Sequence, residues 1–287
     1  MNSSNSDSLR LTPSSVDVDD LPDPLHDGTR SLTVDEARET YLRIERASWK
    51  SDDRTSKYTR HQKVLYPRIL ESDRRFQEQY EGLTTAKLTR GLSPFDESGE
   101  RLTPWELDAM LNGGEIRRSV REAINYHLSE KRDFDFESVG VTSVTQTSGA
   151  PREYIYLWID DPDNKVSAEW LSPALDKHID RCAKAFEEDH AYHKNGSAGA
   201  ITVRHSPPLA SHSKDDFWKI QEDSEEPSYA NTAGAKFVAS QLVHLPVGDY
   251  HNSKRSNPSD TLLNGGALAW ASPYHWFRAS GGVPDLP

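Results

Sequence analysis

Apolar and polar residues alternate in several short segments between residues 82 and 205, and this alternation predicts strands. The clearest segment is GAPREYIYLWIDDP at residues 149–162, where aromatic and aliphatic side chains alternate as in a strand covered on both faces. Residues 136–148 precede it across a short Gly-Ala-Pro turn, so the two segments predict an antiparallel hairpin. Further strands are predicted at residues 82–90 and 200–205.

Apolar residues at helical spacing predict helices before, between and after these strands. The predicted helices cover residues 33–49, 103–133 with a break at Gly113 and Gly114, 167–196, and 231–245. From the strand region onward, the order is strand, helix, hairpin, helix, strand, helix. This order predicts an α+β fold, an antiparallel sheet with helices packed on one face as in a split βαβ unit, plus an N-terminal helical region.

Composition divides the chain into four predicted parts. Residues 1–30 are rich in Ser, Asp and Pro and predict a disordered acidic tail. Residues 31–80 predict a helical and locally basic segment, and residues 81–250 the α+β domain. Residues 251–287 form an aromatic-rich C-terminal segment, which either docks on the sheet or folds as a separate piece.

The overall charge is strongly acidic: 46 Asp and Glu against 34 Lys and Arg give a net charge of −12. The abundance of Asp, the preference for Arg over Lys and the 34% hydrophobic content resemble proteins of salt-loving organisms. At about 1 M salt the Debye length is about 3 Å, so an acidic surface does not exclude DNA from a groove elsewhere. The sequence shows no signal peptide and no apolar run of membrane-spanning length, so we expect a cytoplasmic protein without membrane contact.

Basic and aromatic residues concentrate at two places in the sequence. Residues 50–75 carry eight Lys and Arg with interleaved tyrosines, a pattern that suits DNA and also suits a solvated helical face. Residues 270–278 contain Trp, Tyr, His, Phe and Arg, which either stack on bases or close the core.

The spacing of the histidines and of the single cysteine gives weaker support for a metal site or a reactive thiol. His190, His193 and His205 could hold a transition metal, but the first two also fit an exposed helix end. Cys182 lies with Phe186 on the predicted apolar face of the helix that begins at Ser167, so we expect both to be buried.

Four stretches carry a resemblance to a known family: EYIYLWIDDPDNKVSAEWLSPALDKHIDRCAKAFEEDHAYH, GAITVRH, KFVASQLVHL and ALAWASPYHWFRASGG. Across roughly residues 80–282 the chain resembles replication proteins of haloarchaeal plasmids and pleomorphic viruses, relatives of the rolling-circle initiators called HUH endonucleases. The resemblance implies a strand with a His-hydrophobic-His motif that binds Mg²⁺ or Mn²⁺. It also implies a later helix whose tyrosine attacks a DNA phosphodiester.

The motif positions depart from that family. Where Pro-His-Glu-His is expected, the chain has Pro151, Arg152, Glu153 and Tyr154, and Phe237 stands where a tyrosine is expected. One explanation is a paralogue that binds DNA without nicking. The others are a rearranged site using Glu153, His205 and Tyr229, or a motif located elsewhere in the chain.

We favour the first explanation: a DNA-binding replication protein of a haloarchaeal genetic element, without efficient nicking. The alternatives are an active nickase that uses Tyr229 with Mg²⁺ or Mn²⁺, and an acidic interaction module that binds no nucleic acid. No metal ligand and no further cofactor are assigned, and the oligomeric state and the origin sequence stay open. The expected DNA contacts are Arg60, Lys63, Lys87, Arg90, Arg152, Lys236 and Arg278.

Overall fold

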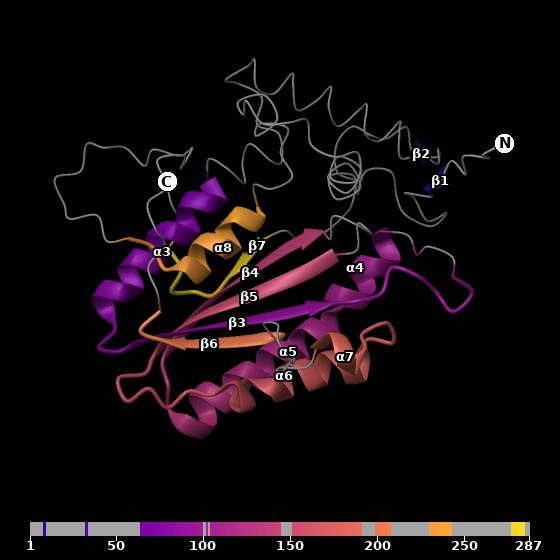
Figure 1. Ribbon diagram of the computed structural model, residues 1–287. Helices are drawn as coiled ribbons and strands as arrows, with labels where there is room; N and C mark the ends of the chain where they lie inside the picture. The colour runs from indigo at the N-terminus through magenta and orange to yellow at the C-terminus, as the bar shows by residue number, and fades with distance from the viewer. Residues whose placement is uncertain are drawn as a thin grey trace, which may run out of the picture.

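The computed structural model describes residues 8–9, 32–33, 64–99, 102, 104–144, 151–190, 199–207, 230–242 and 277–284 (Figure 1). Its helices are α3 Tyr66–Gln79, α4 Pro104–Asn112, α5 Gly114–Asn125, the π-helical turn η3 Tyr126–Glu130, α6 Ala168–Arg181, α7 Glu187–His190 and α8 Ala233–Gln241. Its strands are β1 Ser8–Leu9, β2 Leu32–Thr33, β3 Leu83–Gly91, β4 Phe136–Val144, β5 Pro151–Asp160, β6 Ile201–His205 and β7 Phe277–Ala279.

Five of these strands form one antiparallel sheet in the order β6-β3-β5-β4-β7. The predicted hairpin of β4 and β5 is confirmed, with Val141 opposite Tyr154. The predicted strands at residues 82–90 and 200–205 are confirmed as β3 and β6. The α+β fold class is therefore confirmed, and the aromatic β5 occupies the centre of the sheet.

The main apolar core fills one face of the sheet. Ile155, Leu157 and Ile159 of β5 point toward α5, η3 and α6, which lie below the sheet in Figure 1. Ser167 precedes α6 as its N-cap residue, as predicted, and Gly113 separates α4 from α5. Leu157 and Ile159 are fully buried, so this layer excludes water from the last residues of β5 on this face.

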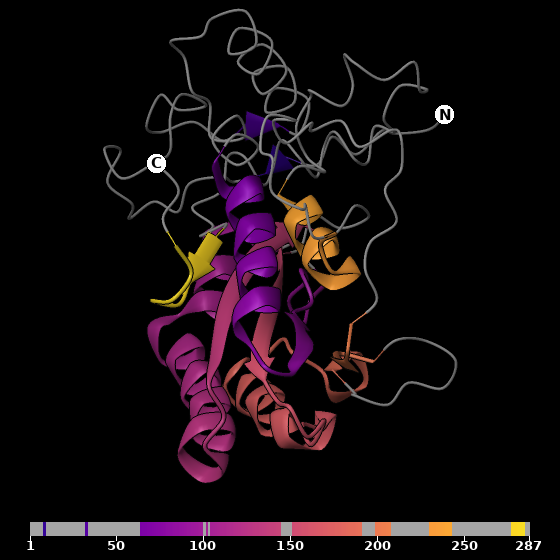
Figure 2. The same cartoon turned by 90° about the vertical axis from the view of Figure 1, so that its left-hand side faces the viewer.

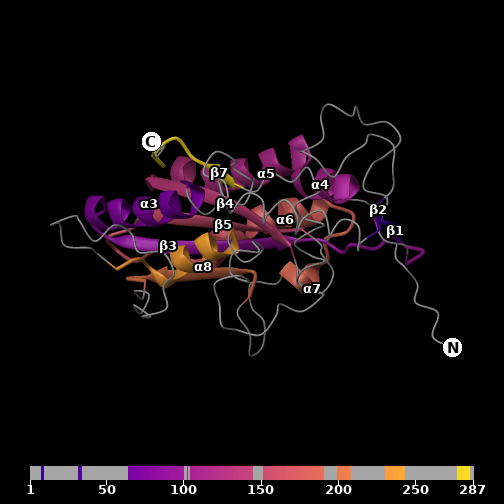
Figure 3. The ribbon, with the colours of Figure 1, turned by 90° about the horizontal axis from the view of Figure 1, so that it is seen from above.

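Helices also cover the opposite face, which the predicted one-sided arrangement did not include. Figures 2 and 3 show α3 and α8 together on the side of the sheet away from α5 and α6. Asp73 of α3 is fully buried there, and its carboxylate accepts hydrogen bonds from Trp158 Nε1 and Thr232 Oγ1, both at 2.7 Å. One carboxylate thus joins α3, the central strand and the start of α8.

Residues from the predicted terminal segments take part in this domain. α3 belongs to the predicted N-terminal segment, and Phe277–Ala279 of the C-terminal segment add β7 to the edge of the sheet. Ser8 and Leu9, in the tail expected to be disordered, pair with Leu32 and Thr33 in a two-stranded ladder. The rest of the helix predicted at residues 33–49 lies outside the described residues.

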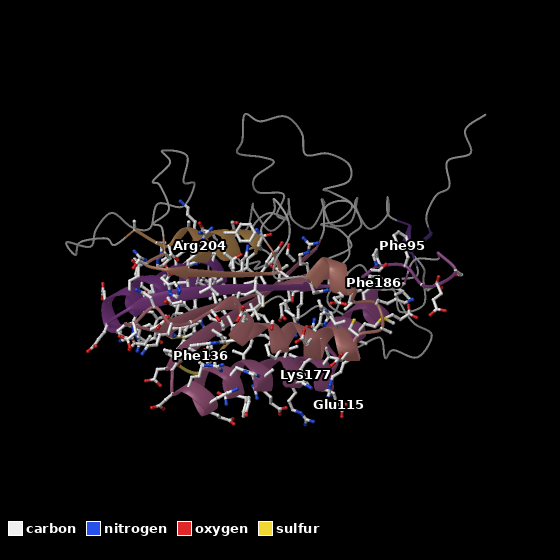
Figure 4. All side chains as sticks on the ribbon, turned by 60° about the horizontal axis from the view of Figure 1, so that its bottom comes forward. Phe95, Glu115, Phe136, Lys177, Phe186 and Arg204 are labelled. Atoms are coloured by element: carbon white, nitrogen blue, oxygen red, sulfur yellow. The ribbon has the colours of Figure 1, made fainter. Side chains whose placement is uncertain are left out.

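The helix that begins at Ser167 is shorter than predicted. It ends at Arg181, and a turn leads to the separate α7. Cys182 is buried as expected, and burial raises the pKa of its thiol. Phe186 was predicted to face the core, but its side chain is 47% exposed, because the turn after Arg181 takes it off the helical stripe (Figure 4).

None of the helices within the described ranges combines the length and the apolar character that crossing a membrane requires.

Candidate nucleic-acid interface

The first residues of β5 place a cation and an aromatic ring on the face that α8 shares. Arg152 is exposed and Tyr154 is half-buried, and residues two apart on a strand point to the same side. The ring of Phe237, on α8, meets the ring of Tyr154 edge-on at 5.4 Å between centroids. The positions that the family resemblance assigns to the second histidine and to the tyrosine are therefore in direct contact.

Lys87 extends this group of side chains on the neighbouring strand β3. Its ammonium lies 4.4 Å from the centroid of the Phe237 ring, within the range of a cation–π contact. Burial lowers the pKa of Lys87 from its ordinary value. Arg204, on β6, is exposed (Figure 4). It pairs with Thr85, so it lies on the same face as Lys87. Lys87, Arg152, Tyr154, Arg204 and Phe237 are called here the cation–aromatic surface.

The position of α8 over this surface depends on a glycine. A Cβ atom at Gly234 would lie 2.7 Å from the ring of Tyr156, so only glycine allows the helix to approach β5 this closely. Thr232 caps the helix by accepting the amide of Ala235, and its hydroxyl bonds Tyr156 Oη at 2.9 Å. These contacts hold Phe237 on the outer side of α8, where it is 40% exposed.

Glu153 points to the opposite face and is part of a buried ion network. Arg90 and Arg278 both donate to its carboxylate, and both also donate to Asn112 Oδ1 at 3.1 Å. Burial alone would raise the pKa of Glu153, but the two guanidinium groups outweigh it and hold that pKa below its usual value. The role of the Glu153 carboxylate is therefore structural.

Two of the predicted DNA contacts belong to this network. Arg90 is 1% exposed, so the prediction that it contacts DNA is wrong: its guanidinium is enclosed by the protein groups it binds. The Arg278 side chain is 22% exposed and binds Glu153 at 2.7 Å. Lys236 is half-buried on α8. Arg60, Lys63 and Tyr229 lie outside the described residues.

Two histidines close the end of β3 next to Arg152. His178 donates through Nε2 to the carbonyl of Gly91 at 2.9 Å, and the amide of Gly91 donates to Nε2 of His190 at 3.1 Å. His190 Nδ1 therefore carries the proton and donates to the carbonyl of Phe186. Both rings form hydrogen bonds with the backbone of Gly91, so neither is arranged as a metal ligand.

The histidine arrangements considered from the sequence are not brought together. His205 bonds Thr84 at the far end of β3, about 23 Å along the strand from Gly91 at about 3.3 Å per residue. His190 and His205 therefore cannot share an ion, and Glu153 cannot form a site with His205. His193 is not among the described residues. Within the described parts of the chain, no group of three His, Cys, Asp or Glu side chains is placed to hold a metal.

Buried His178 predicts a pH dependence of stability. Burial, reinforced by the charge of Arg90, lowers the pKa of His178 to about 4. The unfolded chain binds a proton there below about pH 6.5, so the free energy of unfolding falls as pH drops from about 6.5 to about 4, by roughly 3 kcal/mol. In urea unfolding at a series of pH values, His178→Phe should be less stable at neutral pH and lose this part of the slope. An identical slope in both proteins would contradict the assignment.

The exit of β5 has a structural role. Asp161 is fully buried and accepts from the hydroxyl of Thr84 and from the amides of Lys165 and Val166. These bonds shape the turn that leads into α6.

Arg204 was missed as a candidate in the sequence. The alternation of ITVRH indicates that Thr202 and Arg204 share a face, but only the pairing of β6 with β3 shows which face that is. The sequence predicts that Arg204 lies on a strand, but it does not predict which residues of other elements surround it.

Comparisons with known proteins place these features in context. The sequence model of a family described as "Putative rep protein (DUF1424)" matches residues 30–286. An "Uncharacterized 36 kDa protein" of Halobacterium salinarum is 25% identical over 230 residues, which cover 79% of this chain and 63% of the relative. The chain thus spans less than two thirds of that relative's length. No solved structure matches the chain.

Proposed function

Because this chain belongs to the Rep family, we propose that it binds single-stranded DNA on the cation–aromatic surface without cutting it efficiently. The family model matches residues 30–286, and its description indicates a role in replication. The observation that carries this proposal is the contact of Lys87, Tyr154 and Phe237 beside exposed Arg152. Single-strand binding sites combine cations along the backbone with aromatic rings on which bases stack.

The phosphates and the bases of a single strand each have a partner on this surface. Arg152 offers a planar guanidinium, which binds a phosphate through two parallel hydrogen bonds. The partly exposed ring of Phe237 offers a face or an edge to a base, and such stacking contributes about 1–3 kcal/mol per base. Arg204 at the sheet edge provides a second cation for the same backbone.

The absence of efficient cutting follows from three side chains at motif positions. A nicking site of the related family would need two neutral nitrogen ligands and a phenol. At those positions Arg152 has a guanidinium and Tyr154 a phenol, neither of which supplies a neutral nitrogen ligand, and Phe237 has no oxygen to attack phosphorus. The residues present therefore do not fit a divalent cation, and we assign no step through one. Nicking by Tyr229 remains an untested prediction.

The acidic composition is compatible with this proposal at high salt. The net charge of −12 repels DNA in dilute buffer, whereas about 1 M salt shortens the Debye length to about 3 Å. Stacking is less sensitive to salt than ion pairing is, so we expect affinity to depend mainly on the aromatic contacts under those conditions.

Two variants test the surface through binding of a dye-labelled oligothymidylate, measured by fluorescence anisotropy. We expect Phe237→Ala to weaken binding about tenfold in molar KCl, because it removes a stacking partner. Arg152→Ala should weaken binding about tenfold in dilute KCl and less in molar KCl, because it removes a phosphate contact.

Matched controls lie on the other side of the sheet. Tyr126→Ala removes a ring that is 48% exposed on η3, and Lys177→Ala removes an exposed cation on α6 (Figure 4). Both should bind the oligonucleotide within about twofold of the parent chain. If Phe237→Ala and Arg152→Ala bind as tightly as these controls do, the proposed surface is not the DNA site.

A further inference from the structure

A concave site lies on the face of the sheet opposite the cation–aromatic surface, between α5 and the strands β4 and β7. It is a groove of about 1180 Å³, large enough for a nucleotide-sized ligand. Arg117, Arg118 and Arg121 of α5 line it, and all three side chains are exposed. Arg117 and Arg121 are one helical turn apart and so lie on the same side of the helix. The lining also includes Arg90 and Arg278, which are bound to Glu153, and the carboxylates of Glu122, Glu130, Asp135 and Glu137, so the exposed positive charge of the groove is confined to the arginines of α5.

The lining of the groove changes character along its length. The tight turn between η3 and β4, in which Phe134 donates its amide to Leu128, makes the helix antiparallel to β4. The arginines in the first part of α5 therefore lie toward Gly140 and Arg278, which are paired across β4 and β7. Hydrogen-bond acceptors follow at the other end, where Glu130 and Asp135 line the groove.

An apolar strip runs between these two ends. Phe136 and Ile155 are half-buried and line the groove together with the inward side chains of α5. Gly140 adds no side chain to the floor, and the Glu153 carboxylate lies over it, since a Cβ atom there would be 3.1 Å from Glu153 Oε1. A planar aromatic group can lie on such a strip, beside the ring of Phe136.

We propose that this groove binds a nucleoside phosphate, with its phosphates on Arg117 and Arg121 and its base beside Phe136. Guanidinium groups bind phosphate oxygens in pairs, and the apolar strip receives the base. Glu130 and Asp135 are then placed to accept hydrogen bonds from the sugar hydroxyl or from an amino group of the base. Free nucleotides and a short segment of DNA present the same chemistry to these residues.

This site uses residues of the face opposite the cation–aromatic surface, so either proposal can fail without the other. Arg118 forms an ion pair with Glu122, with 3.5 Å between Nε and Oε1. Arg117 and Arg121 are therefore the residues whose removal is most informative.

The test is isothermal titration of dATP, and separately of a 5′-phosphorylated hexathymidylate, into the full chain and its variants. Arg117→Ala/Arg121→Ala should lose at least about tenfold in affinity for the ligand that binds. Lys165→Ala/Lys177→Ala removes two exposed charges from outside the groove and should change affinity less than about twofold. Circular dichroism checks that each variant is folded.

The two probes distinguish the sources of the ligand. Binding of dATP that depends on Arg117 and Arg121 supports a free-nucleotide site, and equally dependent binding of the oligonucleotide alone supports a strand site. In either case Phe136→Leu should weaken the probe that binds more than it weakens inorganic triphosphate, because the triphosphate has no base to lie beside Phe136. Absence of binding by both probes, or equal affinities in the arginine variant and the control, would overturn the proposal.

Discussion

Replacing Glu153 with alanine is expected to lower the free energy of unfolding by about 3–5 kcal/mol, because it leaves two guanidinium groups without their counter-ion. Arg90 is 1% exposed, so water cannot replace the carboxylate at its guanidinium, whereas Arg278 is 22% exposed and regains only part of its hydration. Both arginines would also be held near each other by Asn112, which adds repulsion between like charges. Urea unfolding followed by tryptophan fluorescence measures the loss.

Two further variants separate charge from shape at this position. Glu153→Gln keeps the hydrogen-bonding outline but removes the charge, so its stability should fall between those of the parent and Glu153→Ala. Glu122→Ala breaks an ion pair whose side chains are both more than 60% exposed, and it should cost less than about 1 kcal/mol. A loss at Glu153→Ala no larger than at Glu122→Ala would show that the network does not stabilise the fold.

Asp73→Ala is expected to cost about 3–5 kcal/mol, because it leaves several buried donors without an acceptor. Trp158 Nε1, Thr232 Oγ1 and the amide of Thr232 all lie 2.7 Å from its carboxylate oxygens. The same change loosens the start of α8, which carries Phe237. Binding of single-stranded DNA should therefore weaken together with stability.

Trp158 provides an internal check on the Asp73 variant. Its indole meets the ring of Phe76 at a tilt and the ring of Tyr156 edge-on in the buried layer under α3, so loss of the Asp73 bond should shift its fluorescence before global unfolding. Gln77→Ala removes one part-buried donor to Asp73 and should cost less than about 1 kcal/mol. Equal stability of Asp73→Ala and Gln77→Ala would contradict the central role of Asp73.

The sequence was most informative where a local pattern decides structure. Alternation along residues 151–160 predicted β5, and the Gly-Ala-Pro turn predicted its pairing with β4. The break at Gly113 and the cap at Ser167 were also visible locally. These features depend on neighbours in the chain, and a single sequence contains that information.

Local sequence patterns could not predict contacts between residues far apart in the chain. Arg90 and Arg152 look alike as basic residues at strand ends, yet one is buried against Glu153 and the other is exposed. Which side of a strand meets solvent depends on elements more than sixty residues away. The same holds for Asp73, whose polar side chain among the charged residues of α3 gave no sign of its buried partners Trp158 and Thr232.

The end of the helix after Ser167 shows a different limit. Apolar residues continued at helical spacing through Phe186, so periodicity alone extended the helix. The amide of Cys182 instead closes the last turn on the carbonyl of His178, and the pair of histidines binds the backbone of Gly91 beyond it. Tertiary hydrogen bonds outweighed the local pattern there.

The central claim, that the surface around Arg152 and Phe237 holds single-stranded DNA without cutting it, is tested most directly by one incubation. The full chain is mixed with labelled single-stranded oligonucleotides and Mn²⁺ in molar KCl, and the products are examined by filter binding and by denaturing electrophoresis. The account predicts retained DNA on the filter and no covalent protein–DNA band. A covalent band abolished by Tyr229→Phe, or an absence of binding at every salt concentration, would contradict it.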